Sequence, residues 1–203
     1  VVVPLILLAR PAQLILRALP PQTTKRTIGF LFGRRGPRAL VIGITAPVAG
    51  FVLFNVNMTF WHLPAFYDAA VRDDWIHNLQ HAMFFGTAAL YWWPIIDPVP
   101  RHHRQSEMWS MGSVFLSMMV SSIIGAIITL AESVLYPFYL EAGNPWGWAP
   151  LLDQQVGGLI MWIGGGFLYF AVLFALVIQI ITRDEKRVRP QVAPAQREPT
   201  AAS

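Results

Sequence analysis

The sequence predicts an all-α protein, a polytopic bundle of about five transmembrane helices. Of its 203 residues, 55% are hydrophobic and 13% are charged, and the mean hydropathy is +0.48, whereas about a quarter of the residues in a typical soluble domain are charged. The apolar residues fall in runs of about 20, the length that a helix needs to cross a hydrocarbon layer of roughly 30 Å. The basic residues stand between these runs. Together these observations indicate that the bilayer is the solvent of the fold.

The transmembrane domain is predicted over residues 1–182, with spans at 1–19, 39–61, 75–96, 108–131 and 152–182. The first span is the weakest because two prolines and an arginine interrupt it, and its start within an apolar stretch without Met leads us to expect missing residues ahead of Val1. In the second span, Pro47 and Gly50 predict a kink that neighbouring helices can tolerate. The last span is long enough to tilt or to project from the bilayer. Residues 183–203 form a basic tail rich in Pro and Ala, for which we expect disorder.

The charged residues predict which side of the membrane each connection faces. Cytoplasmic loops retain Lys and Arg, and these residues gather after the first span, after the third span and in the tail: Lys25, Arg26, Arg34, Arg35, Arg38, Arg101, Arg104, Arg183, Lys186, Arg187, Arg189 and Arg197. The two remaining connections, 64–74 and 132–151, hold a single Arg, Arg72, against five acidic residues. This alternation predicts a multi-pass protein with acidic outer loops and a cytoplasmic C-terminus.

Several classes of function are excluded. The sequence pI is about 9.9, but nucleic-acid binding needs a solvated basic face, and here the basic residues lie in short stretches between apolar runs. The chain has no Cys, which excludes disulfides, thiolate metal sites and cysteine nucleophiles. We find no nucleophile paired with a base and no phosphate-binding glycine loop, so we do not expect an enzyme that acts on its own.

The fourth span carries small residues at four-residue spacing, namely Ser113, Ser117, Ser121 and Gly125. This spacing places them on one stripe of a helix, where small side chains let another helix approach closely. The stripe therefore indicates helix packing.

A layer of His, Asp and Gln side chains is predicted near the outer face. It consists of His62 at the end of the second span, His77 and His81 at the start of the third, and Asp153, Gln154 and Gln155 at the start of the fifth. His77 and His81 lie four residues apart on one helix face, which lets two imidazoles share an ion. Ionisable residues in a membrane domain are costly and are functional candidates. The plainer alternatives are that each His hydrogen-bonds a neighbour and that Asp153 and its neighbours cap the last helix.

The types of side chain in this layer indicate which metal or cofactor such a site would bind. Imidazole without thiolate favours copper, and Met161, two turns after Asp153, is the best thioether candidate, although Met also fills gaps in ordinary cores. We therefore predict a copper site with His62, His77, His81 and Asp153 as ligands and with Gln154 and Gln155 as supporting residues. Haem is the rival cofactor, with His62 opposite His77 or His81.

Four strings of the sequence resemble one known family. They are WHLPAFYDAA (61–70), IHNLQHAMFFGTAALYWWPII (76–96), LYPFY (135–139) and DQQVGGLIMWIGGG (153–166). Their order over most of 39–182 resembles the CtaG family of caa3-type cytochrome c oxidase assembly factors. The resemblance implies a protein of the bacterial cytoplasmic (inner) membrane and its respiratory chain, with further helices ahead of Val1. It also implies cytochrome c oxidase subunits as partners, and His62, His77, His81 and the 153–155 trio as the residues that fall on the family's motifs.

Two positions depart from the family pattern. Gln80 stands where we expect Glu, and Glu132 stands where we expect a neutral residue. The first departure removes a possible carboxylate ligand, and the second adds a carboxylate at the outer face.

The sequence thus predicts a membrane assembly factor of a haem–copper cytochrome c oxidase that handles copper at the outer face. Two alternatives stay open. One is a permanent structural subunit of a larger electron-transfer membrane complex, which the Gln80 departure favours. The other is a haem-binding membrane subunit.

Overall fold

The computed structural model describes residues 2–8, 45–96, 105–143 and 146–188, together with positions 22 and 43. Within these residues every regular element is a helix, so the predicted all-α class is confirmed. The basic connection after the first span, the connection that holds Arg101 and Arg104, and the chain beyond Val188 lie outside the described residues. The charge-based orientation therefore stays a prediction.

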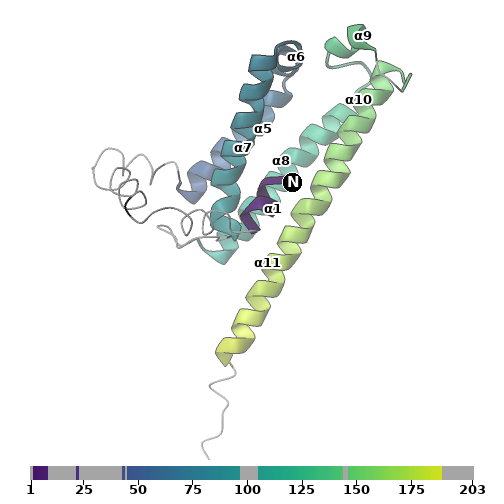
Figure 1. The fold of residues 1–203 in the computed structure, drawn as a ribbon. Coiled ribbons are helices and arrows are strands. Elements are labelled where there is room, and N and C mark those ends of the chain that lie inside the picture. The colour runs from purple at the N-terminus through teal and green to yellow at the C-terminus, as the bar shows by residue number, and fades with distance from the viewer. Residues whose placement is uncertain are drawn as a thin grey trace, which may run out of the picture.

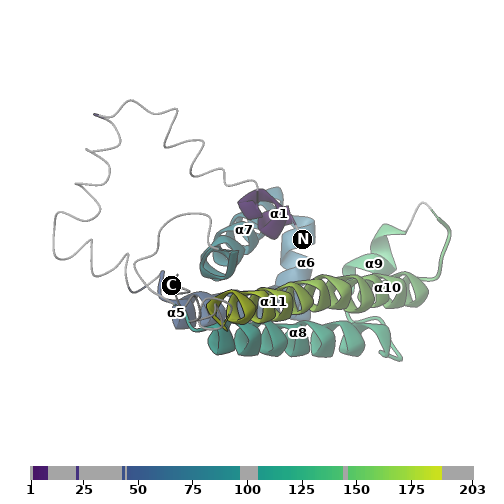
Figure 2. The same ribbon diagram turned by 90° about the horizontal axis from the view of Figure 1, so that it is seen from below.

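In chain order the helices are α1 (Val2–Leu8), α5 (Pro47–His62), α6 (Pro64–Arg72), α7 (Asp74–Ile96), α8 (Glu107–Thr129), α9 (Phe138–Ala142), α10 (Pro150–Leu159), the π-helix η1 (Ile160–Gly164) and α11 (Gly165–Val188). Figure 1 shows two long pairs, α5 with α7 and α8 with the continuous α10, η1 and α11. Seen from below in Figure 2, α8 and α11 run side by side, and α1 lies against α7. The short helices α6 and α9 lie at one end of the two pairs (Figure 1).

Among the described helices, two are long and apolar enough to cross a membrane, Glu107–Thr129 and Pro150–Thr182. The helix α5 has 16 residues, about 24 Å, and positions 39–42 and 44 of the predicted second span lie outside the described residues. The five-span bundle is thus not confirmed in the described residues. What the structure supports is the coarser statement that the protein is helical and has two candidate spans.

The helices α5 and α7 pack closely because Gly50 of α5 has no side chain and leaves room for the backbone of α7. A Cβ on Gly50 would lie 2.9 Å from the carbonyl oxygen of Leu90. One turn further along α5, Phe54 stacks on Tyr91 with ring centroids 4.8 Å apart. Pro47 stands at the start of α5, where a proline needs no partner for an N–H. Pro47 therefore begins the described helix and does not lie inside it, and positions 39–42 and 44 ahead of it lie outside the described residues.

The small residues Ser113, Ser117, Ser121 and Gly125 are buried on α8. A Cβ on Gly125 would lie 2.8 Å from the Cβ of Trp162. The last helix therefore lies so close to α8 that no side chain fits between them at this position. Nearer the other end, the Asn55 amide on α5 donates to the Ser117 hydroxyl at 2.9 Å. The stripe on α8 thus contacts both α5 and the last helix.

The last helix is unbroken from Pro150 to Val188, so it continues past residue 182, where the tail was predicted to begin. Its outward side chains include Phe167, Phe170 and Phe174, which are 72%, 65% and 61% exposed. Soluble monomers rarely expose an apolar face of this kind. The face is in keeping with lipid as the surroundings of this helix.

Candidate functional site

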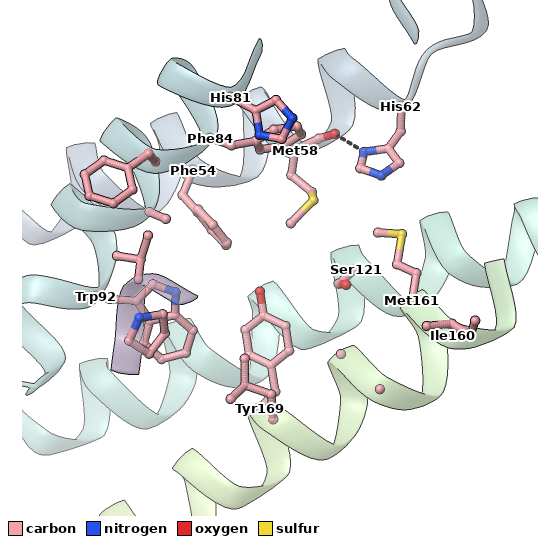
Figure 3. A pocket seen from close by; sticks show the side chains of 17 residues that line it. Phe54, Met58, His62, His81, Phe84, Trp92, Ser121, Ile160, Met161 and Tyr169 are labelled. Carbon is pink, nitrogen blue, oxygen red and sulfur yellow. Dashed lines mark hydrogen bonds between the residues drawn. The ribbon is translucent and has the colours of Figure 1, made fainter. Parts of the chain in front are cut away.

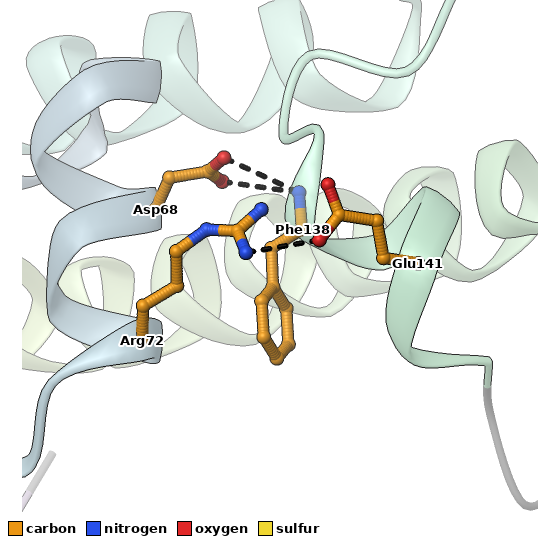
Figure 4. Close-up of polar contacts among 4 residues, drawn as sticks. All are labelled: Asp68, Arg72, Phe138 and Glu141. Atoms are coloured by element: carbon orange, nitrogen blue, oxygen red, sulfur yellow. Dashed lines mark hydrogen bonds and ion pairs between the residues drawn. The ribbon is translucent and has the colours of Figure 1, made fainter.

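The helix α6 holds the connection that follows α8. The Asp68 carboxylate accepts the backbone N–H of Phe138 at 3.2 Å, and Arg72 donates to Glu141 at 2.9 Å (Figure 4). The Arg72 guanidinium also lies 5.3 Å from the ring centre of Phe138. The hydrogen bond from Arg72 and its charge hold the pKa of Glu141 below its usual value. The one basic residue of the predicted outer loops therefore ties α6 to α9.

Gln154 and Gln155 hold the same connection from the other side. The Gln154 side chain, which is buried, accepts the N–H of Leu135 at 2.6 Å and donates to the carbonyl of Ser133 at 3.4 Å. Gln155 donates to the carbonyl of Ala131 at 3.0 Å. Both amides satisfy backbone groups that have no partner in a regular element. We predicted them as supporting residues of the metal site, and here they fix the path of the chain.

Three tyrosines link this connection to α5 and α6. The Tyr67 and Tyr139 hydroxyls lie 2.7 Å apart, and the Tyr136 hydroxyl donates to the backbone carbonyl of His62 at 3.1 Å. Burial raises the pKa of Tyr136 to about 12, so its hydroxyl stays protonated and can donate. Burial also raises the pKa of Tyr67, and the hydrogen bond with Tyr139 and the negative charge of Asp153 raise it further. Asp153 therefore acts electrostatically on Tyr67.

A cavity of about 650 Å³ lies between the two helix pairs. Its wall is mostly apolar, and four side chains with ligating atoms stand in it: His62, His81, Met58 and Met161 (Figure 3). The Nδ1 atom of His62 lies 2.7 Å from the carbonyl oxygen of Met58. This contact makes Nδ1 the donor and leaves Nε2 as the atom with a free lone pair. His62 is thus prepared to accept a cation.

Met161 reaches the cavity from a π-helical turn. In η1 the neighbouring residue, Trp162, packs on Gly125 of α8, while Met161 lines the cavity. A π-turn inserts an extra residue into a helix and is frequent at functional sites. Two adjacent residues of the turn therefore have different roles, since Trp162 packs against α8 and Met161 lines the cavity.

His77 and His81 meet on the exposed flank of α7. Their Nε2 atoms are 2.9 Å apart and their ring centroids 4.6 Å apart. Both side chains are exposed, and His81 also lines the cavity whereas His77 is not among its lining residues. The spacing that placed these two imidazoles on one helix face therefore brings them into direct contact.

The four predicted metal ligands do not assemble as one group. Within the described part of the chain, no three His, Asp or Glu side chains lie close enough to share an ion. His62 and His81 share the cavity, His77 contacts His81 outside it, and Asp153 does not line it. Asp153 sits in the first turn of α10, two turns before Met161, and a carboxylate on a short side chain does not extend that far along the helix.

The two departures from the family pattern lie away from the cavity lining. Gln80 is half-buried on α7, and Glu132 is exposed in the connection after α8.

Sequence reasoning missed Met58. This residue precedes His62 by four positions and so lies on the same face of α5. The same four-residue spacing had identified the pair His77 and His81, but it was applied to histidines alone.

Comparison with known proteins agrees with the motifs. A family model described as cytochrome c oxidase caa3 assembly factor (Caa3_CtaG) matches residues 1–183. The chain belongs to this family. The Caa3_CtaG match includes every residue that lines the cavity, and it confirms the resemblance seen in the sequence.

Two curated relatives extend the comparison. They are uncharacterized proteins of Mycobacterium bovis and Mycobacterium tuberculosis, each 28% identical to this chain over 191 residues. The matches cover 90% of this chain and 28% of each relative, so the chain spans less than a third of their length. No solved structure matches the chain.

Proposed function

We propose that this protein is a membrane assembly factor of a haem–copper cytochrome c oxidase and that it binds copper(I) in the cavity between its two helix pairs. The assembly role is supported by membership of the Caa3_CtaG family. The copper role is supported by one observation, that two imidazoles and two thioethers line the same largely apolar cavity. Binding would take place in a multi-pass protein of the bacterial cytoplasmic membrane, near its outer face.

The donor set fits copper(I) better than other metals. Thioether and imidazole are soft to borderline ligands, which select Cu(I), whereas Mg²⁺ and Ca²⁺ need oxygen ligands. Zinc sites are built from thiolate, imidazole and carboxylate, and here the cavity offers only imidazole from that set. His62, His81, Met58 and Met161 would hold the ion.

The hydrogen bonds around His62 support it as a ligand. Metal-ligating histidines almost always donate their other ring N–H to a carbonyl or carboxylate, as the contact between His62 and the Met58 carbonyl allows. The Tyr136 hydroxyl holds the backbone of His62 from the side of the connection. Both contacts fix the ring before an ion arrives.

Haem fits this arrangement less well in the form that the sequence suggested. His62 and His81 come from the paired helices α5 and α7, and Figure 3 shows both on the same wall of the cavity. Bis-His ligation requires imidazoles on opposite faces of the porphyrin. The haem alternative therefore needs a different axial pair.

Copper binding is tested with the full chain in lipid nanodiscs. Cu(I) is titrated against a chromophoric chelator, and we expect close to one equivalent bound to the wild type and a large loss of affinity in His62→Ala and His81→Ala. Asp153→Ala is the matched control, because that side chain does not line the cavity, and it should bind as the wild type does. Equal Cu(I) binding in all four proteins would refute the site.

The same preparation separates the alternatives. A Soret band in the purified protein would favour the haem-binding subunit. Absence of both copper and haem binding, with stable co-purification in a large respiratory complex, would favour a permanent structural subunit.

A further inference from the structure

The histidine pair on α7 has the geometry of two ligands of one metal ion. Its Nε2 atoms are 2.9 Å apart, and metal–imidazole bonds are about 2.0–2.1 Å long. An ion bound to both nitrogens would therefore have an N–metal–N angle of about 90°, whereas a tetrahedral ion would hold them about 3.3 Å apart. Right angles between neighbouring ligands are typical of square-planar or tetragonal ions, of which Cu(II) is the commonest with N and O ligands.

We propose that His77 and His81 form a second metal site, separate from the cavity, that binds a divalent ion of the Cu(II) class. Both imidazoles are exposed, which leaves room for water molecules to complete a tetragonal coordination shell. No third His, Asp or Glu joins the pair in the described residues, so the site is a two-imidazole site with open positions. Cu(II) heads the divalent affinity series at such ligands.

The free protein prepares this pair by a hydrogen bond. At 2.9 Å, one Nε2 must carry a proton and donate it to the other. When an ion binds both Nε2 atoms, the proton moves to Nδ1 of the same ring, so both imidazoles stay neutral and two metal–nitrogen bonds replace the hydrogen bond. The site is therefore formed without movement of the helix.

The two sites share one residue. His81 contacts His77 through Nε2 and also lines the cavity, and a neutral imidazole has one free ring lone pair, so it can bind only one ion at a time. A divalent ion on the pair therefore withdraws His81 from the cavity and leaves His62, Met58 and Met161 there. This coupling rests on the proposed Cu(I) site, whereas the pair site itself does not.

Electron paramagnetic resonance tests the pair site directly. The full chain in nanodiscs receives one equivalent of Cu(II), and we expect a tetragonal signal with modulation from two imidazoles. His77→Gln, a change at an exposed position, should lose the two-imidazole signal. His62→Gln is the matched control and should keep it, since His62 does not touch the pair. A signal from one imidazole or none in the wild type, or an unchanged signal in His77→Gln, would overturn the proposal.

A tetragonal ion that does not exchange electrons with Cu(I) tests the coupling. With Ni(II) bound, the wild type should bind Cu(I) more weakly, and His77→Gln should show no such effect of Ni(II). Unchanged Cu(I) affinity in the presence of bound Ni(II) would overturn the sharing of His81. If instead no Cu(I) binds under any condition while the Cu(II) signal persists, the proposed cavity site fails and the pair site stands.

Discussion

The two helix pairs of this protein carry different chemistry. The pair of α5 and α7 holds His62, His77 and His81, and the described part of its first member has 16 residues. The pair of α8 and the last helix contains both candidate spans, small buried residues and an exposed apolar face. Of the two imidazoles and two thioethers that line the cavity, only Met161 comes from the second pair. The candidate spans therefore lie in one pair and most of these side chains in the other, with the cavity at their boundary.

The largest expected effect is a loss of stability in the pair formed by α8 and the last helix. Gly125→Leu places a side chain where a Cβ alone would lie 2.8 Å from Trp162, and we expect a destabilisation on the order of 3 kcal/mol from overpacking. Gly157→Leu is the control, because nothing lies within 4 Å of its added Cβ. Equilibrium unfolding in mixed micelles measures both. Equal stabilities of the two variants would contradict the close approach of the helices.

A smaller loss of stability is expected where the connection is held. Gln154→Met keeps the length of the side chain and removes its hydrogen bonds to Leu135 and Ser133, which should cost about 2 kcal/mol. The Leu135 amide should then exchange its hydrogen faster. Gln155→Met removes a single bond to Ala131 and should cost less, so the opposite order would show that the connection is held elsewhere.

The thioether contribution is expected to appear in binding rather than in stability. Met161→Leu conserves volume and should cost less than about 1.5 kcal/mol of stability. It should weaken Cu(I) binding about tenfold, which corresponds to roughly 1.4 kcal/mol. Met83→Leu is the control, since Met83 lies on α7 outside the cavity lining. Chelator competition gives both affinities, and no difference between them would remove Met161 from the site.

The smallest effect concerns the exposed ion pair of Arg72 and Glu141. Because Arg72 lowers the pKa of Glu141 in the folded state, its contribution is present above the carboxyl pKa of the unfolded chain and is lost as the pH falls through the lowered pKa. The melting temperatures of wild type and Glu141→Gln should therefore differ slightly near about pH 7 and converge in acid. Added salt should reduce the difference. A difference that grows in acid would have the wrong sign.

Spacing rules predicted those contacts that lie within one helix. The four-residue interval placed His77 next to His81 and gathered Ser113, Ser117, Ser121 and Gly125 on one buried stripe. These predictions need only the helical period, which local sequence determines. The all-α class followed from composition in the same way.

Contacts between segments that are distant in the sequence could be predicted less well. Asp153 and His62 were placed at the same depth, but depth does not specify the direction of a side chain around its helix, and Asp153 acts on Tyr67 instead of the cavity. The roles of Gln154 and Gln155 depend on how the chain returns between α8 and α10. Met161 lines the cavity from a π-turn, and no pattern in the sequence predicted this turn.

X-ray absorption at the copper edge of the Cu(I)-loaded full chain tests the shared cavity most directly. We expect sulfur and imidazole nitrogen in one coordination shell, with the sulfur lost in a Met58→Leu, Met161→Leu double variant. A shell of nitrogen and oxygen alone, or sulfur that persists in the double variant, would show that copper does not bind where the two helix pairs meet.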